Sequence, residues 1–145
     1  MAAPAARAWR ASERSRPVAP VANDRLEIRS DPAKGRGVYA TAAIAAGSLI
    51  ESAPVIVVPA EQCALLDRTI LHDYYFDWDG DAAHGGSGAV ALGIVSLCNH
   101  SRRPSARVRR NRAQSSLDLV ALTAIAAGDE ITIDYNCPLW FEAQD

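Results

Sequence analysis

The sequence is poor in lysine, cysteine and long apolar runs, and each scarcity excludes a class of protein. Lys34 is its only lysine, and the other 14 of its 15 Lys and Arg residues are arginines; with the heavy use of alanine, this is typical of a GC-rich, bacterial genome. The three cysteines, Cys63, Cys98 and Cys137, are odd in number and widely spaced, which argues against a disulfide framework and for a reducing, cytoplasmic location. No apolar run reaches the roughly 18 residues of a membrane-spanning helix, so no membrane association is expected.

Charge and size indicate one ordinary globular domain. The net charge of -2 gives no global attraction to nucleic acid or anionic membranes, and 49% apolar residues suffice for one core among 145 residues. Residues 1–22 are rich in Ala, Arg, Ser and Pro with few large apolar side chains, so we expect a disordered arm. Its arginines also resemble an organelle transit peptide, which is the alternative. The folded domain is expected over residues 23–145, with a short aromatic tail.

Short strands dominate the first half of the domain. Leu26–Arg29 alternates apolar and polar residues as a half-buried strand does. Residues 31–37 are expected to form a turn before a strand over Val38–Ala40. The segment Ile44–Ile50 recurs as Ile125–Ile131, and each contains a glycine that closes a turn before a strand. Two equivalent corners of a β-rich fold follow from this recurrence.

The middle of the chain adds more strands and one helix. Leu49–Val58 is apolar and β-branched but is interrupted by Pro54, which favours two short strands or an edge strand. Leu66, Ile70 and Tyr74 fall at helical spacing after Pro59, so one short helix is expected there. Further strand patterns are found at Tyr75–Trp78 and in a hairpin that pairs Arg107–Arg110 with Leu117–Ala121.

Two polar segments follow apolar runs and suggest a site at the edge of the core. Asn99-His100-Ser101 ends the apolar run that begins at Gly93, and Glu130–Asn136 carries a second polar cluster on a strand-like run. The ordinary interpretation is a turn made by Asn99 and Ser101, with His100 satisfying a buried carbonyl group.

Together these segments resemble the SET domain, the fold of protein-lysine methyltransferases, over residues 24–141. The motifs occur in the family's order, and Pro104 follows the third: Lys34–Tyr39, Ile44–Ile50, Leu97–Ser101 and Asp129–Tyr135. The resemblance implies a mostly β fold of several short twisted sheets, with one short helix and a pseudoknot-like threading of the C-terminal segment.

The sequence departs from many family members in its cysteines. Arg102 stands where they have a cysteine after Asn-His-Ser, and the tail Asn136–Phe141 offers only Cys137. A structural zinc site needs about four closely spaced ligands, and no such set is present. The resemblance is therefore to the minimal viral and bacterial SET domains, and no metal is expected.

The resemblance implies methyl transfer from S-adenosyl-L-methionine to the side-chain amine of lysine in a protein substrate. Tyr135 would be the catalytic residue, assisted by Tyr74; a tyrosine that only caps the core is the alternative. The apolar Ile133 predicts that more than one methyl group can be added. The cofactor-binding residues would be Lys34, Gly35, Arg36, Gly37, Tyr39, Asn99, His100, Tyr135 and Trp140, and the substrate channel would be lined by Tyr74, Tyr75, Ile133 and Tyr135. For Trp140 and Phe141, an aromatic plug of the core is the alternative to covering the adenine.

Other functions remain open at this point. A SET-like protein-binding module without catalysis would keep the fold alone. The arginines of the stretch Arg102–Arg112 form either a solvated face or a nucleic-acid-binding surface. His72 and His84 have no metal partners at useful spacing and are expected on the surface or in loops. The protein is expected to be a monomer or a homodimer.

Overall fold

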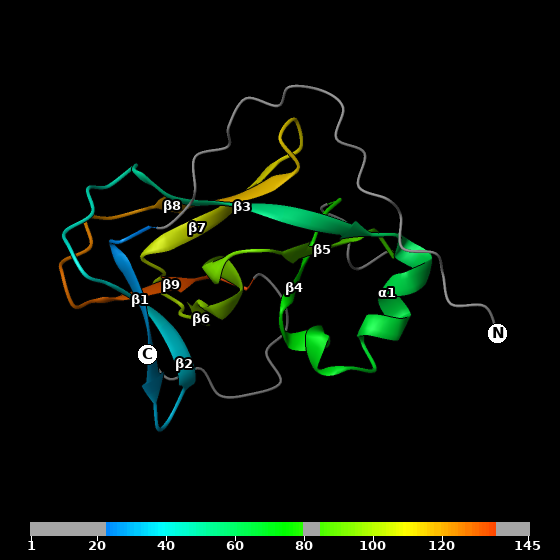
Figure 1. Cartoon of the computed structure of the whole chain (residues 1–145), viewed down its shortest axis with the longest axis horizontal. Helices are drawn as coiled ribbons and strands as arrows, with labels where there is room; N and C mark the ends of the chain where they lie inside the picture. Colours follow the sequence, from blue (N-terminus) through cyan, green and yellow to red (C-terminus); the bar gives the residue numbers. More distant parts are fainter. Residues whose placement is uncertain (1–22, 80–84, 136–145) are drawn as a thin grey trace.

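The computed structural model describes residues 23–79 and 85–135, which form two sheets around one core (Figure 1). A four-stranded sheet has the order β1-β2-β9-β6, and a five-stranded sheet has the order β4-β5-β3-β8-β7. The strands are β1 (Leu26–Asp31), β2 (Gly35–Ala40), β3 (Leu49–Val58), β4 (Tyr75–Asp77), β5 (Gly88–Ala91), β6 (Asn99–His100), β7 (Ala106–Asn111), β8 (Ser116–Ala121) and β9 (Glu130–Ile133). This confirms the predicted mostly β class.

The β1–β2 hairpin has a tighter turn than the sequence predicted. The two strands pair from Leu26 opposite Ala40 to Asp31 opposite Gly35, so β2 begins inside the expected turn. The Asp31 carboxylate accepts hydrogen bonds from the backbone N–H groups of Ala33 (2.7 Å) and Lys34 (2.9 Å), which lower the pKa of Asp31. Gly35 completes the reversal with a φ of 78°, a conformation that favours glycine.

In the four-stranded sheet, β9 is inserted between two strands that are distant in sequence. It pairs antiparallel with β2, and it pairs parallel with β6, where Asn99 lies opposite Thr132 and His100 opposite Ile133. The Ser101 N–H continues this pairing to the Ile133 carbonyl group at 3.0 Å. This crossing brings the two polar segments of the sequence to one edge of the sheet.

The expected edge strand at Leu49–Val58 is instead one continuous strand, β3, at the centre of the five-stranded sheet. Its first half pairs with β8 up to Pro54, and its second half pairs with β5 from Val55 onward. Pro54 is tolerated at the centre of the sheet because it lies where β3 exchanges one partner for the other. There it needs no N–H donor, while its carbonyl group accepts from the Leu92 N–H (2.8 Å).

The two predicted corners are confirmed, as is the hairpin of β7 and β8. Ile44 and Ile125 face each other in an antiparallel bridge, with backbone hydrogen bonds of 2.9 Å in both directions. Each corner then turns at a glycine of positive φ, Gly47 at 80° and Gly128 at 91°. The repeated sequence therefore builds a pair of corners that contact each other.

The predicted helix is shorter than its apolar spacing indicated. Helix α1 covers Ala60–Leu66, and a separate 3-10 turn, η1, covers Ile70–Asp73. Thr69 separates them because its backbone is extended (φ -121°, ψ 169°) and its hydroxyl accepts from the Leu71 N–H at 3.1 Å. The continuation of the helix to Tyr74 was therefore a wrong prediction.

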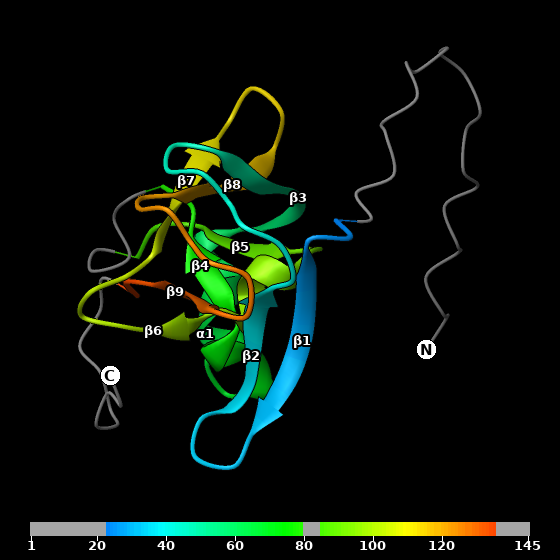
Figure 2. The ribbon, with the colours of Figure 1, turned by 90° about the vertical axis from the view of Figure 1, so that its left-hand side faces the viewer.

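The core lies between the sheets, and the β1–β2 hairpin projects away from β3, β7 and β8 (Figure 2). The largest fully buried side chains of the core are Leu117, Leu119, Ile131, Ile133, Val38, Val95 and Cys98.

No helix within residues 23–79 and 85–135 is long and apolar enough to cross a membrane.

Candidate functional site

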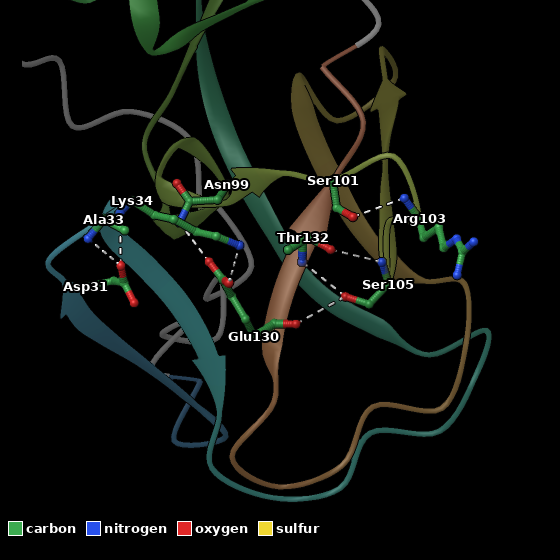
Figure 3. Close-up of polar contacts among 9 residues, drawn as sticks. All are labelled: Asp31, Ala33, Lys34, Asn99, Ser101, Arg103, Ser105, Glu130 and Thr132. Atoms are coloured by element: carbon green, nitrogen blue, oxygen red, sulfur yellow. Dashed lines mark hydrogen bonds and ion pairs between the residues drawn. The ribbon is translucent and has the colours of Figure 1, made fainter. Parts of the chain in front are cut away.

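A polar cluster formed by Lys34, Asn99 and Glu130 lies where β6, β9 and the start of β2 meet (Figure 3). The Asn99 Nδ2 atom donates to Glu130 Oε1 at 2.7 Å. The other carboxylate oxygen, Oε2, lies 3.5 Å from Lys34 Nζ. The Glu130 side chain is 16% exposed, so the cluster is shielded but still reaches solvent. Glu130 was in the predicted motif, but its role as the centre of this cluster was not predicted.

Gly37 packs directly against this cluster. A Cβ atom at this position would lie 2.7 Å from Glu130 Oε1 and 2.9 Å from Asn99 Nδ2. Both distances are shorter than any normal carbon contact, so only glycine admits the paired side chains here. Gly35 differs, because no atom lies within 4 Å of a Cβ built on it and its positive φ explains it.

Tyr135 follows β9 and returns to the segment that carries Asn99 and His100. Its hydroxyl donates to the Cys98 carbonyl group at 3.0 Å, and its backbone N–H donates to His100 Nδ1 at 3.2 Å. The rings of His100 and Tyr135 lie 5.3 Å apart, tilted by 56°. This orienting contact of the His100 side chain was not predicted from the sequence.

The tautomer of His100 follows from these contacts. Its Nδ1 atom lies 3.7 Å from Asp134 Oδ1, which would be an ion pair only with a protonated ring. The shorter contact of 3.2 Å is a hydrogen bond that Nδ1 accepts from the Tyr135 N–H, which requires a lone pair on that atom. In this geometry Nδ1 is the acceptor, as in the tautomer that carries its ring proton on Nε2.

Cys98 contributes its carbonyl group and not its thiol to the site. The side chain is small and only 1% exposed. Burial is the largest cause that raises the pKa of the Cys98 thiol, and the nearby charges of Glu51 and Glu130 raise it further. The thiol is therefore not a nucleophile in this protein.

Tyr39, another predicted cofactor residue, lies beside the polar cluster. Tyr39 lies opposite Glu130 in the β2–β9 pairing, and the Arg29 guanidinium lies 4.8 Å from the centre of its ring. Burial is the main cause that raises the pKa of Tyr39, and the charge of Glu130 adds to it. Arg36 is exposed on β2, and Trp140 lies outside the described residues.

The predicted channel residues come from separate elements of the fold. Tyr74 is half-buried and ends η1, whereas Tyr75 lies on β4 and its hydroxyl donates to Asp67 at 2.7 Å. Burial and this hydrogen bond raise the pKa of Tyr75. Ile133 is 2% exposed and packs within the hydrophobic core. The channel roles of all three remain predictions.

A hydrogen-bonded loop after the Asn-His-Ser segment holds β9 in place (Figure 3). The Ser105 N–H donates to Thr132 Oγ1 at 3.2 Å, and the Thr132 N–H donates to Ser105 Oγ at 3.0 Å. Before it, Ser101 Oγ accepts from the Arg103 N–H at 3.0 Å. Ser101 was predicted as a turn residue of the Asn-His-Ser motif. Ser105 was not predicted, although the short polar step between Pro104 and β7 is a signal for such a loop.

A buried carboxylate supports the same segment from the other side. Glu51 is 7% exposed, and its two oxygens accept from the N–H groups of Ile94 and Val95, both at 2.9 Å. These residues begin η3 (Ile94–Leu97), which leads directly into Asn99. A Cβ at Gly93 would lie 2.6 Å from Glu51 Oε1, so this glycine admits the carboxylate.

The arginine stretch is partly occupied by internal contacts. Arg109 pairs with Asp118 and Arg110 with Asp77, both at 3.0 Å. Arg112 donates to the Trp78 carbonyl group, also at 3.0 Å. These three guanidinium groups therefore make contacts within the fold. Binding of nucleic acid by this stretch remains a prediction.

No metal centre is formed by the part of the chain that the structure describes, where no three His, Cys, Asp or Glu side chains are grouped for one. His72 is exposed, as predicted, and its Nδ1 lies 3.1 Å from Asp67. His84 and Cys137 lie outside the described residues. Independence from metal remains a prediction.

Comparisons with known proteins agree on one family. The family model of the SET domain matches residues 35–136. The chain is 33% identical over 124 residues to a histone-lysine N-methyltransferase of Schizosaccharomyces pombe, named as specific for lysine 37 of histone H3; the match covers 85% of this chain and 81% of that protein. The crystal structure of a candidate histone methyltransferase of Plasmodium falciparum superposes with a TM-score of 0.61 at 24% identity, over 81% of this chain and 97% of that one. This last similarity concerns the fold alone.

Proposed function

This chain belongs to the SET-domain family and is an S-adenosylmethionine-dependent protein-lysine methyltransferase, and we propose that Tyr135 is its catalytic residue. The bound cofactor supplies a methyl group activated by its sulfonium. The observation that carries the proposal is the hydrogen bond of 3.0 Å from the Tyr135 hydroxyl to the Cys98 carbonyl group. It joins the ends of the two motifs and fixes the hydroxyl directly beside Asn99 and His100.

Tyr135 would act by orienting the reacting amine. Lysine has a reference pKa of about 10.4, so its amine must lose a proton before it can attack the methyl group. A hydroxyl that donates to Cys98 still has oxygen lone pairs that can accept an N–H of the neutral amine. Alignment of the amine, the methyl carbon and the leaving sulfur is then the main contribution of the protein.

The residues around Glu130 fit the amino-acid end of the cofactor. Asn99 donates its N–H to Glu130, which leaves the amide oxygen as an acceptor for an ammonium group. Arg36 would supply positive charge for a carboxylate at the same end, and Lys34 would act there through its contact with Glu130. We propose that these residues and Gly37 form the cofactor site, supported by Gly35 and Tyr39, with His100 and Trp140 toward the adenine.

The lysine channel is proposed around Tyr74. Tyr75 has its hydroxyl committed to Asp67, which favours Tyr74 as the aromatic residue beside the incoming side chain. Ile133 would contribute from beneath the surface, since it is buried and lies two residues before Tyr135 in sequence. Addition of more than one methyl group, as the apolar character of Ile133 predicts, is part of this proposal.

We propose a basic protein segment as the substrate. The insert over residues 59–79, which contains α1, η1 and β4, carries Glu61, Asp67, Asp73 and Asp79 against Arg68 as its one Lys or Arg, while its fifth acidic residue, Asp77, is paired with Arg110. A negative surface favours a positively charged partner. The fission-yeast relative is named for a lysine of histone H3, which makes histone H3 a suitable first test protein. The bacterial origin, the cytoplasmic location and the monomeric or homodimeric state remain predictions.

Labelled cofactor provides the test. The purified chain is incubated with S-[methyl-³H]adenosylmethionine and either histone H3, an acidic protein rich in surface lysines, or a bacterial lysate, with Tyr135→Phe as the paired control. We expect label on lysine of basic proteins with the wild type and much less with the variant. Equal labelling by both folded proteins would contradict the role of Tyr135, and preferential labelling of the acidic protein would contradict the proposed substrate class.

A further inference from the structure

We infer that Glu130 is a positioning residue that sets the orientation of the Asn99 amide, and that Lys34 acts through Glu130. This inference rests on the proposed function, because Asn99 is taken to contact the cofactor. It concerns a residue that would not itself touch the reacting atoms. Three observations carry it: the hydrogen bond from Asn99 to Glu130, the space that Gly37 leaves for it, and the position of Lys34 on the opposite oxygen of the same carboxylate.

The chemistry of the pair determines which way the amide points. A carboxylate only accepts hydrogen bonds, so the Asn99 atom that lies 2.7 Å from Glu130 Oε1 must be the NH₂ nitrogen. The carbonyl oxygen of the amide is then directed away from Glu130. Without the carboxylate, the amide could rotate by half a turn and present its NH₂ group in place of the oxygen. Glu130 therefore selects the hydrogen-bonding character that Asn99 offers to a ligand.

Gly37 shows that the fold reserves space for this pair. The two atoms that a Cβ at Gly37 would approach within 3.0 Å are Glu130 Oε1 and Asn99 Nδ2, the acceptor and donor of this hydrogen bond. The φ of Gly37 is not in the positive range, so its backbone conformation does not require glycine. A motif glycine is thus explained by the contact between the Asn99 and Glu130 side chains.

Lys34 balances the charge of Glu130 from the other side. Its Nζ lies 3.5 Å from Oε2, and the side chains of Lys34 and Glu130 are 26% and 16% exposed. The contact of 3.5 Å between Lys34 Nζ and Glu130 Oε2 is weaker than the hydrogen bond from Asn99 to Glu130. Lys34 therefore acts mainly as a nearby positive charge. The ammonium group lies close enough to balance the charge of the carboxylate that accepts from Asn99. Loss of Lys34 should therefore weaken ligand binding only while a carboxylate occupies position 130.

The first test measures the apo protein and needs no ligand. Glu130→Gln keeps the size of the side chain but offers Asn99 a neutral partner. Asp129→Asn is the matched control, because it removes the same charge from the adjacent, exposed residue. In NMR spectra, the Asn99 side-chain amide is identified by its disappearance in Asn99→Asp. We expect its bonded proton to move upfield in Glu130→Gln and to stay in Asp129→Asn. An unchanged resonance in Glu130→Gln would overturn the inference.

The second test is calorimetric binding of S-adenosylhomocysteine, with thermal unfolding to verify that each variant is folded. We expect about tenfold weaker binding for Glu130→Gln, since hydrogen bonds to charged groups are the stronger kind, and unchanged binding for Asp129→Asn. Lys34→Met should weaken binding in the wild-type background but not in Glu130→Gln. Additive effects would mean that Lys34 binds the ligand directly and would overturn its part of the inference.

The outcomes separate the inference from the proposed function. Wild-type binding with no change in Glu130→Gln overturns the positioning role and leaves the function intact. Absence of wild-type binding overturns both, because no cofactor site would then exist for Glu130 to organise. A rise in KM for the cofactor at unchanged kcat in Glu130→Gln is the kinetic result expected of positioning the cofactor end and not the reacting amine.

Discussion

Two shielded carboxylates, Asp118 in the five-stranded sheet and Glu130 in the four-stranded sheet, differ in how completely the chain satisfies them. Asp118 Oδ1 accepts from the hydroxyls of Ser52 (2.7 Å) and Ser116 (3.2 Å), and Oδ2 accepts from Arg109 (3.0 Å) and Asn111 (3.3 Å). Its side chain is 4% exposed. Every acceptor direction is used within the fold, so this cluster is closed.

The Glu130 cluster is open by the same criteria. Among the described residues, one oxygen accepts a single close hydrogen bond from Asn99, and the other has only the longer contact with Lys34. The side chain is four times as exposed as that of Asp118, at 16% against 4%. A closed polar cluster contributes to stability, whereas an open one retains groups that a ligand can use. The comparison therefore predicts that mutations will separate stability from binding and catalysis.

The largest effect is expected for Tyr135→Phe at the open site. Removal of one positioned hydroxyl costs about ten- to a thousand-fold in rate, while the lost bond to the Cys98 carbonyl group costs the fold only about 1 kcal/mol. Initial methylation rates and urea unfolding of the same preparations check both parts. A folded variant as fast as the wild type would remove Tyr135 from the reaction.

Gly37→Ala should weaken cofactor binding by about tenfold or more, because its Cβ would displace the Asn99–Glu130 pair. Gly128→Ala is the matched control. It lies at a corner with a φ of 91° and no atom within 4 Å of a built Cβ, so it should cost about 1 kcal/mol of stability and leave binding unchanged. Calorimetry with S-adenosylhomocysteine and thermal unfolding distinguish the two. Equal binding by both variants would contradict the close packing at Gly37.

Asp118→Ala should affect the closed cluster alone. It leaves two hydroxyls, an amide and a guanidinium without their shared acceptor, and we expect the free energy of unfolding to fall by about 2–4 kcal/mol. Binding of S-adenosylhomocysteine should be retained at temperatures where the variant is folded. Arg109→Met is a milder comparison, since the Arg109 side chain is 60% exposed and its pairing contributes about 1 kcal/mol or less. A loss of binding in folded Asp118→Ala would show that the clusters are coupled.

The smallest effect concerns pH. Burial alone would raise the pKa of Asp118, but its four hydrogen bonds outweigh burial and hold the pKa below its ordinary value of 3.8. A carboxyl group with a lowered pKa in the folded state stabilises the protein above its unfolded pKa, and this stabilisation is lost as the pH falls through the folded value. The stability difference between wild type and Asp118→Asn should therefore be constant from pH 7 to about 5 and shrink below about 4. A difference that grows on acidification would contradict this sign.

The sequence predicted the features that depend on local pattern. The alternation of apolar and polar residues identified β1, and the glycines at 47 and 128 identified the corners. The resemblance to the SET family predicted that Asn99 and Tyr135 belong to a common site. Pairing between strands that are distant in sequence could not be predicted from local pattern. The parallel contact of β6 with β9 brings Asn99 to Glu130, and no periodicity in either segment indicates it.

The same limit explains the missed carboxylates and the helix. Asp118 alternates with Leu117 and Leu119, as a solvent-facing residue of a half-buried strand would, but β8 is buried along its whole length. In the sequence Glu51 is a single polar residue in an apolar strand, and its two N–H partners come from η3, which is distant in sequence. The helical spacing up to Tyr74 was real, yet Thr69 ended the helix by capping the next turn. Buried polar groups are identified by their partners, and those lie elsewhere in the chain.

The scarcity of lysine makes Lys34 a natural reporter. It is the only side-chain amine among the 145 residues, and its Nζ lies within the polar cluster on Glu130. An amine-reactive fluorophore would therefore attach at Lys34 or at the chain's amino terminus, and protection of Lys34 from the reagent would measure occupancy of the cluster. For a lysine methyltransferase the consequence is also analytical. Within these 145 residues, a search for self-methylation on lysine has one side chain to examine, and a methyl-lysine at any other position lies outside them.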